Sequence, residues 1–155
     1  GRIMKLSANF QLSELVKSQV AERKGIPNNP SPAHIDNLKA LCVNVLQPIR
    51  SHFDSPVLIS SGYRSAELCI AIGSKPTSQH SEGKAADIEV VNVDNKELAE
   101  WIRDNLEFDQ MILEFYRDGE PDSGWIHVSW NSGENRNQTL RASRDEERGT
   151  VYRPW

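Results

Sequence analysis

The sequence has few cysteines, and their spacing excludes the sites that small proteins most often build from them. Cys42 and Cys69 are the only two, and neither belongs to a CxxC or CxxH pattern. They therefore match neither a zinc knuckle nor a disulfide framework. We expect two buried thiols, with a single disulfide between them as the alternative.

Long apolar runs and an excess of basic charge are also missing. No run approaches the roughly 18 apolar residues that would suggest a membrane span. Charged residues make up 26% of the chain and the formal net charge is −4, so the sequence offers no basic footprint for nucleic acid or for a membrane surface. We therefore expect a soluble protein without nucleic-acid binding or membrane insertion. Separately, we expect it to act as a monomer.

A secretory leader is not recognisable either. Met4, followed by KLSANFQLSEL, is interpreted as the natural start, with residues 1–3 left over from cloning. No charged segment followed by an apolar one comes after Met4, so we expect no signal peptide and synthesis in a cytoplasm. The chain of 155 residues fits one domain, residues 4–155, with enough length to bury a core.

Apolar residues at helical spacing predict several helices. The first runs from Ser13, a candidate cap, to about Lys24, and Gly25 ends it. The second begins at Pro32 and continues to Ile49, with Pro48 bending or interrupting it. Two shorter helices are expected at residues 66–72 and 95–105.

Runs rich in β-branched and apolar residues predict a small sheet. The expected strands cover residues 57–60, 85–91, 109–116 and 125–130, with one more near 139–142. Helices segregated from such a sheet define the α+β class. We therefore expect a single α+β domain with a small, mostly antiparallel sheet and the helices packed on one side.

The segment SQHSEGKAADIEV, residues 78–90, places a histidine and an aspartate where they can meet. Side chains alternate along AADIEV, so Asp87 points away from Ile88 and its apolar neighbours and can face a cleft. Gly83 lets the loop after His80 turn back, at a positive φ that other residues resist. His80 and Asp87 can then converge.

A second segment, DQMILEFYRDGEPDSGWIHVSW, predicts a hairpin around the turn residues RDGEPDSG. If Tyr116 lies opposite Trp125, then Glu114 lies directly opposite His127, and Ser129 follows on the same polar face. Directly opposed side chains have Cβ atoms about 5 Å apart. The polar face of this hairpin can therefore contribute two or more groups to one site.

His80, Asp87 and His127 together have the composition of a catalytic zinc site. Two histidines and one carboxylate leave one coordination position open, whereas structural zinc sites are closed by four ligands. Zinc lowers the pKa of its water to about 7 and polarises a carbonyl. An uncoordinated carboxylate can take the proton of that water and pass it to a leaving amine, and Glu114 is the candidate. The sequence therefore predicts one Zn²⁺ per chain and hydrolytic chemistry.

Several separated motifs carry a family resemblance. Ser78, His80, Gly83, Ala85 and Asp87 fit the pattern SxHxxGxAxD, by which the chain resembles the zinc D-alanyl-D-alanine carboxypeptidase family, a family that also includes phage peptidoglycan endopeptidases. WIHVS is similar to the second histidine strand of that family, and SSGYRS to its arginine segment. FQLSEL and NLKALCVNVLQPIR extend the likeness to the phage branch over most of the chain.

The resemblance implies roles for individual residues and a hedgehog/D-Ala-D-Ala peptidase-like fold. It places His80, Asp87 and His127 on zinc, and it gives Arg64 the role of holding a substrate carboxylate or the developing oxyanion through its fork of donors. Ser78 would line the substrate cleft. Ser129, on the second histidine strand, is a further candidate substrate-binding residue. For both serines the alternative is a hydrogen bond to the backbone.

The chain departs from the family pattern at one position. In many relatives the catalytic glutamate lies three residues before the second histidine, where this chain has Gly124. The predicted register of the hairpin favours Glu114 as the base over the loop residues Glu120 and Asp122. The alternative for Glu114 is a buried salt bridge with Arg64.

Together the motifs predict a zinc metallopeptidase that hydrolyses a peptide bond in the stem peptides of bacterial peptidoglycan, as a D-Ala-D-Ala carboxypeptidase or an endopeptidase. The resemblance to the phage branch suggests an endolysin, made in the host cytoplasm and acting at the cell wall. The alternative is a zinc-binding recognition or virion module that uses the same fold without catalysis. The sequence leaves open which bond is cleaved and in which host.

Overall fold

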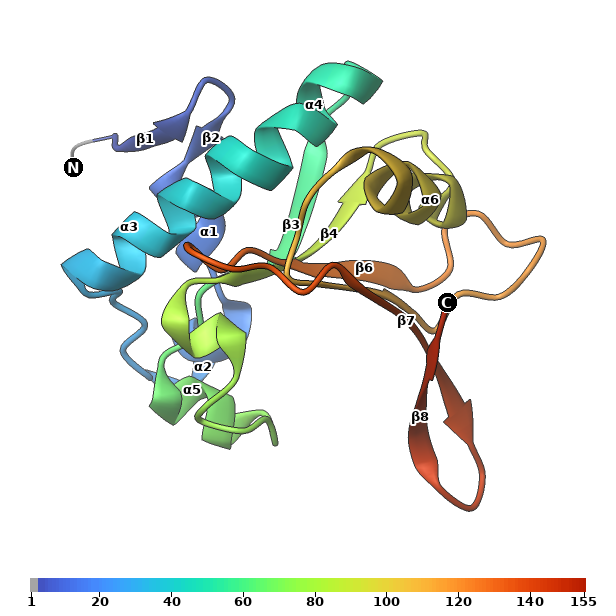
Figure 1. Cartoon of the computed structure of the whole chain (residues 1–155). Coiled ribbons are helices and arrows are strands. Elements are labelled where there is room, and N and C mark those ends of the chain that lie inside the picture. The colour runs from blue at the N-terminus through green and yellow to red at the C-terminus, as the bar shows by residue number, and fades with distance from the viewer. Residues whose placement is uncertain (1–2) are drawn as a thin grey trace.

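A six-stranded mixed sheet organises residues 3–155, the part of the chain that the computed structural model describes (Figure 1). Neighbouring strands are antiparallel except β5 and β7, which are parallel. The predicted α+β class with a mostly antiparallel sheet is therefore confirmed, and residues 1 and 2 of the segment ascribed to cloning lie outside the described residues. In spatial order the strands are β3 (Val57–Ser61), β4 (Ala85–Val90), β6 (Trp125–Ser129), β5 (Gln110–Glu114), β7 (Gln138–Asp145) and β8 (Gly149–Pro154).

The longer helices lie together on one face of the sheet, and the shorter ones lie elsewhere (Figure 1). The first group comprises α3 (Pro32–Leu41), the π turn η1 (Cys42–Leu46), α4 (Gln47–Phe53) and α6 (Asn95–Asn105). The remaining elements are β1 (Lys5–Ser7), β2 (Phe10–Gln11), α1 (Leu12–Val16), α2 (Gln19–Lys24), α5 (Ala66–Ala71) and the 3₁₀ turn η2 (Gln79–Glu82).

The hydrophobic core fills the space between the sheet and the long helices. Leu38 and Ile49 of the second helical region, Ile102 of α6 and Ile88 and Ile126 of the sheet are all fully buried there. Burying an aliphatic side chain of this size stabilises a fold by about 1.5–3 kcal/mol. Because this face of the sheet is used for packing, the opposite face is available for polar side chains.

Both cysteines are buried free thiols, as predicted. Burial raises the pKa of Cys42 to about 12, and the nearby charge of Glu14 adds to the increase. Neither thiol of the described chain forms a disulfide, so the fold depends on its core for stability.

The first predicted helix, from Ser13 to Lys24, was wrong in its continuity and in its cap. The structure contains two short helices, α1 and α2, and the cap of α1 is Gln11. Ser18 interrupts the helical region because its hydroxyl accepts a hydrogen bond from a backbone amide of α2 and so begins a new helix. Gly25 ends α2 in the left-handed conformation, as predicted.

The second helical region is interrupted near Pro48, as predicted. The interruption takes the form of η1, a π turn between α3 and α4, in which the amide of Gln47 donates to the carbonyl of Cys42. Proline has no amide proton to continue the α-helical pattern, and single π turns often absorb such a defect.

The predicted register of the hairpin was wrong by two residues. Ile112 lies opposite His127, and Glu114 lies opposite Trp125. The reason is that Phe115 adopts a left-handed conformation, with φ 56°, so β5 ends one residue before it and the connecting loop is longer than predicted. A shift by two residues leaves every side chain on its predicted face, which is why Glu114 still faces the site.

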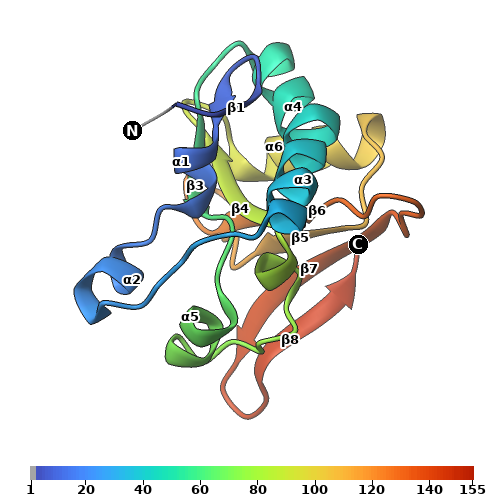
Figure 2. The same cartoon turned by 90° about the vertical axis from the view of Figure 1, so that its left-hand side faces the viewer.

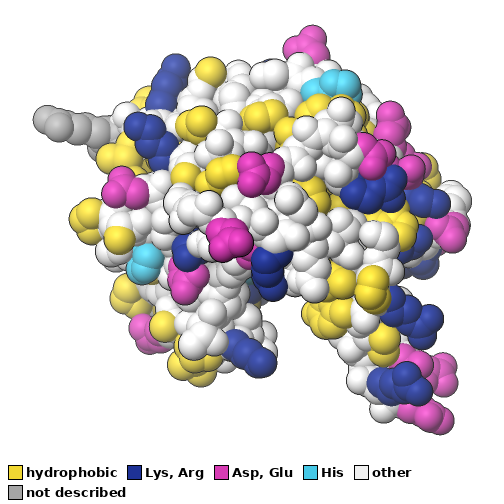
Figure 3. Space-filling view, viewed as in Figure 1, with side chains coloured by type: hydrophobic (Ala, Val, Ile, Leu, Met, Phe, Trp, Pro, Cys, Tyr) yellow, Lys and Arg dark blue, Asp and Glu magenta, His cyan; other side chains and the backbone are white. Residues whose placement is uncertain are grey.

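The strand expected near residues 139–142 is part of a longer hairpin, formed by β7 and β8. The hairpin extends beyond the rest of the sheet and lies below it, at the same end as α5 (Figure 2). Its tip carries charged side chains of both signs (Figure 3). No helix in residues 3–155 is long and apolar enough to cross a membrane.

Asp109, just before β5, joins three segments around the cleft that contains the candidate site. Its carboxylate accepts hydrogen bonds from Gln79 at 2.8 Å and from the guanidinium of Arg136, also at 2.8 Å. The hydrogen bonds from Arg136 outweigh burial and hold the pKa of Asp109 at about 2, below its ordinary value of 3.8. Asp109 thereby fixes η2 to the loop that precedes β7.

We expect Asp109→Asn to lower the free energy of unfolding by about 2 kcal/mol near neutral pH, because a pKa difference of one unit corresponds to about 1.4 kcal/mol. The folded-state pKa is the lower one, so this contribution is present above 3.8 and is lost as the pH falls through about 2. Urea unfolding of both proteins across this range should show the difference shrinking with acidification. Asp104→Asn, which removes an exposed carboxylate, is the control, and an equal loss in that variant would contradict the assignment.

Candidate metal centre

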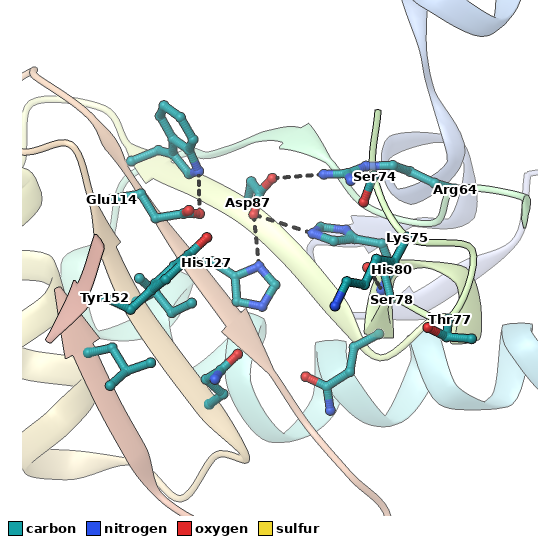
Figure 4. A pocket seen from close by; sticks show the side chains of 15 residues that line it. Arg64, Ser74, Lys75, Thr77, Ser78, His80, Asp87, Glu114, His127 and Tyr152 are labelled. Carbon is teal, nitrogen blue, oxygen red and sulfur yellow. Dashed lines mark hydrogen bonds and ion pairs between the residues drawn. The ribbon is translucent and has the colours of Figure 1, made fainter. Parts of the chain in front are cut away.

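The three predicted metal ligands meet at the centre of the sheet. Asp87 of β4 lies directly opposite His127 of β6, and η2 brings His80 beside them (Figure 4). Oδ1 of Asp87 is 3.1 Å from Nδ1 of His127 and 3.5 Å from Nε2 of His80. The three candidate ligand atoms all lie within 4.8 Å of one another, which is the spacing expected of groups that could share one metal ion.

His80 is held so that Nε2 faces the other ligands. Its Nδ1 donates to the backbone carbonyl of Gly62 at 2.7 Å, which leaves the lone pair on Nε2. Ser78 supports this arrangement, because its hydroxyl accepts a hydrogen bond from the amide of His80 and caps η2. Burial lowers the pKa of His80, so the neutral form that a metal requires is favoured.

Gly83 allows the chain to leave η2 and enter β4. Its φ is +75°, the positive value that the sequence predicted, and a Cβ there would come within 2.5 Å of the carbonyl oxygen of His34. Its amide donates to the carbonyl of His80 at 3.3 Å. A side chain at this position would therefore displace either α3 or the loop that carries His80.

Arg64 orients the carboxylate of Asp87. Its Nη2 lies 3.2 Å from Oδ2 of Asp87, and its Nε donates to the hydroxyl of Ser61 at 2.7 Å. Burial acts to raise the pKa of Asp87, but hydrogen bonds with His127 and His80 outweigh it and keep that pKa below its ordinary value. Asp87 is therefore ionised, and Oδ1 remains directed toward the histidines. Arg64 forms this ion pair in place of the alternative salt bridge with Glu114.

Glu114 lies at the edge of the same cleft. It is half-buried at the end of β5, and Trp125 on the adjacent strand donates its indole N–H to Oε2 of Glu114 at 2.9 Å. Burial raises the pKa of Glu114, and the negative charge of Asp87 raises it further. A carboxylate in this environment is a stronger base than an exposed glutamate. Trp125 also forms part of the cleft wall.

Gly124 lies three residues before His127, at the position where the family resemblance leads one to expect a glutamate. Its φ is +66°, and a Cβ placed on it would collide with the carbonyl oxygen of Glu114. The close approach of two backbone segments therefore requires glycine here. A glutamate at this position is therefore excluded by packing, and the carboxylate that lines the cleft is Glu114 at the end of β5.

The cleft has a volume of about 690 Å³ and includes most of the predicted site residues. Arg64, Ser78 and Glu114 line it together with the three metal-ligand candidates. Ser129 does not, because it is fully buried and its hydroxyl accepts a hydrogen bond from the amide of Gln110. The structure therefore brings Ser78 to the cleft and leaves Ser129 within the sheet.

Two walls of the cleft include residues that the sequence did not single out. Lys75 lines the wall formed by the loop after α5, and Leu140 and Tyr152 line the wall formed by the β7–β8 hairpin. In the space-filling view a hollow separates this hairpin from the body of the protein (Figure 3). No short motif marks these residues, and Leu140 and Tyr152 reach the cleft only through the pairing of β7 with β5 and of β8 with β7.

The donor set fits zinc. One carboxylate oxygen and two imidazole nitrogens are ligands that Zn²⁺ accepts in catalytic sites, in which one position remains open to the cleft. The Nδ1 bond of His80 and the ion pair of Asp87 with Arg64 are the supporting contacts that such ligands usually have. Zinc is also the ion expected from the sequence.

Residues 8–129 match the model of a family described as Peptidase M15. The matched segment contains all three metal-ligand candidates and Glu114, and it ends before the β7–β8 hairpin. A comparison with curated proteins found no match.

Proposed function

The chain belongs to the Peptidase M15 family, and from this we propose that it is a zinc-dependent peptidase that cleaves a peptide bond in bacterial peptidoglycan. One observation carries the proposal. His80, Asp87 and His127 converge at the base of a cleft in which Glu114 is the neighbouring carboxylate that forms no ion pair with them. Family membership supports a metallopeptidase, and the cluster supports one metal ion per chain.

Different residues of the cleft have different roles in the proposed hydrolysis. Zinc held by His80, Asp87 and His127 would supply a Lewis acid that polarises the substrate carbonyl and makes water more acidic. Glu114 takes the proton of the attacking water and delivers it to the leaving amine. Trp125 fixes Oε2 of Glu114, so Oε1 is the atom available for this transfer.

Arg64 is suited to bind a substrate carboxylate. Its Nε and Nη2 are engaged by Ser61 and Asp87, and within residues 3–155 Nη1 forms no ion pair, so this nitrogen is available to an anionic ligand. Lys75 lines the same side of the cleft, and in residues 3–155 it forms no salt bridge. Two positively charged side chains on one wall are complementary in charge to the carboxylates of peptidoglycan stem peptides.

The identity of the substrate is supported by sequence patterns. SxHxxGxAxD, SSGYRS and WIHVS are similar to the motifs of D-Ala-D-Ala carboxypeptidases and phage endopeptidases, and the first helical segments resemble the phage branch. A cleft of about 690 Å³ is large enough for several residues of a peptide. We therefore propose an endolysin-type role at the cell wall, with residues 4–155 acting as one peptidase domain.

The test combines metal analysis with digestion of purified peptidoglycan. We expect one zinc per chain by elemental mass spectrometry, and we expect zinc-dependent release of D-alanine or of cleaved stem peptides, identified by mass spectrometry of muropeptides. Chelation should abolish the release and added zinc should restore it. His127→Ala should lose the metal, while His52→Ala should retain it, because His52 stacks on Trp101 away from the cleft.

Each outcome has a definite meaning. Free D-alanine identifies a carboxypeptidase, and internal cleavage identifies an endopeptidase. Bound zinc without turnover of any wall fragment would favour a recognition or virion module without catalysis. Absence of stoichiometric zinc in the purified, folded protein after incubation with the metal would refute the proposal.

A further inference from the structure

The β7–β8 hairpin forms a wall of the cleft although it lies outside the segment that matches the family. The match ends at residue 129, whereas Leu140 of β7 and Tyr152 of β8 both line the cleft. The hairpin is held in place by parallel pairing of β7 with β5, the strand that carries Glu114. These side chains therefore belong to a part of the cleft that the family match does not describe.

Strand register aligns Tyr152 with Glu114. Glu114 of β5 pairs with Ala142 of β7, and Ala142 in turn pairs with Tyr152 of β8. The three residues lie in one row across the sheet and share a face, with neighbouring strands about 4.8 Å apart. Ala142 is 4% exposed and has only a methyl group, so its side chain leaves room above the sheet for the aromatic ring of Tyr152.

The hydroxyl of Tyr152 points toward the end of the cleft that contains Glu114 and His127. In Figure 4 the ring extends from the hairpin toward Glu114 and His127, on the side of Asp87 opposite Arg64. This side has no other hydroxyl among the labelled residues. Arg64, by contrast, is engaged with the carboxylate of Asp87.

Tyr152 is chemically poised to donate a hydrogen bond. Burial raises the pKa of Tyr152, and the negative charge of Glu114 raises it further, so the phenol stays protonated at neutral pH. Within residues 3–155 its hydroxyl forms no hydrogen bond, whereas the hydroxyl of Tyr116 donates to Asp94 at 2.9 Å. The side chain of Tyr152 remains about half exposed, so a ligand in the cleft can reach it.

We propose that Tyr152 is a catalytic residue, whose hydroxyl donates a hydrogen bond to the carbonyl oxygen of the scissile peptide as that oxygen gains negative charge. The inference rests on the proposed function, since it adds a donor to the same reaction. The phenol keeps its proton throughout, so the proton transfers still begin and end at Glu114. A donor aimed at a developing oxyanion is typically responsible for a factor of about 10² or more in kcat.

The experiment compares Tyr152→Phe with the wild type, because phenylalanine keeps the ring and removes the hydroxyl. With zinc-loaded protein and a soluble stem pentapeptide ending in D-Ala-D-Ala, or a cross-linked muropeptide if that is the substrate cleaved, we expect kcat to fall about 10²-fold with little change in KM. The affinity for a phosphinate analogue of the same peptide, measured by calorimetry, should fall by a similar factor. Tyr116→Phe is the matched control and should leave both quantities unchanged.

The other possible results either contradict the role of Tyr152 or show whether the proposed function has failed independently of that role. Unchanged kcat in Tyr152→Phe, with a raised KM in Tyr152→Ala, would show that the ring is only a wall. If the wild type cleaves no peptide, the proposed function fails, and the phosphinate affinities still decide whether Tyr152 donates to a tetrahedral oxygen. Equal phosphinate affinity in the two proteins, or no phosphinate binding by either, would overturn the inference.

Discussion

Glu114→Gln is expected to lower kcat by about 10²–10⁴-fold, the usual contribution of a general base. Glutamine has the same shape and can still accept the hydrogen bond from Trp125, so the fold and the cleft should persist. It cannot take a proton from water, so only the rate of the chemical step should fall. Steady-state kinetics on a defined muropeptide, with zinc content and melting temperature measured on the same sample, would check this expectation.

The control for this variant is Glu120→Gln in the connecting loop. Glu120 was one of two alternative bases in the loop, beside Asp122, but its side chain is 56% exposed and pairs with Arg117 on the surface. Its replacement should leave kcat unchanged. Full activity of Glu114→Gln in a normally folded, zinc-loaded protein would show that another group is the base, although the enzyme class would stand.

Gly124→Glu is expected to unfold the protein and not to restore the family's usual glutamate. Any side chain at this position must adopt φ near +66° and place its Cβ against the carbonyl oxygen of Glu114. Backbone strain of this kind combined with a collision between two backbone segments costs about 4 kcal/mol or more, a large part of the stability of a small domain. Chemical denaturation and soluble yield would measure the loss.

Gly119→Ala provides the matched control for this effect. Gly119 also has a positive φ, at +85°, but a Cβ there meets no atom within 4 Å. Its replacement should cost only the conformational strain, about 1–2 kcal/mol. Introducing Gly124→Glu into the Glu114→Gln protein should give no recovery of turnover, and a stable double variant with restored kcat would contradict the packing explanation.

Periodicity was a reliable guide to which side chains face the site. Alternation along β4 placed Asp87 on the face opposite the core, and the structure agrees. The same alternation kept Glu114 on the correct face even though the predicted register was wrong by two residues. Because side chains alternate between the two faces of a strand, the face on which a residue lies depends on its position along that strand. The predicted face of Glu114 is therefore correct although the predicted pairing between the strands was wrong.

Contacts between distant segments could not be predicted from periodicity. The break between α1 and α2 depends on one serine that competes for a backbone amide, and the length of the hairpin loop depends on the left-handed conformation of Phe115. The assignment of Ser129 to the cleft was an extrapolation from its strand, whereas in the structure Ser129 is fully buried and its hydroxyl accepts a hydrogen bond from the amide of Gln110. The hydrogen bond that each of these residues forms depends on which partner lies nearby in the folded chain.

The sequence by itself determined the ligand types, the face on which each one lies and the glycine that turns the chain between His80 and Asp87. These properties follow from local geometry and from the chemistry of individual side chains. Only the tertiary structure decided that Asp87 lies opposite His127, that Arg64 pairs with Asp87, and that Tyr152 reaches the cleft across Ala142. Strand pairing between segments far apart in the chain is fixed by the packing of the whole sheet, and no local pattern encodes it.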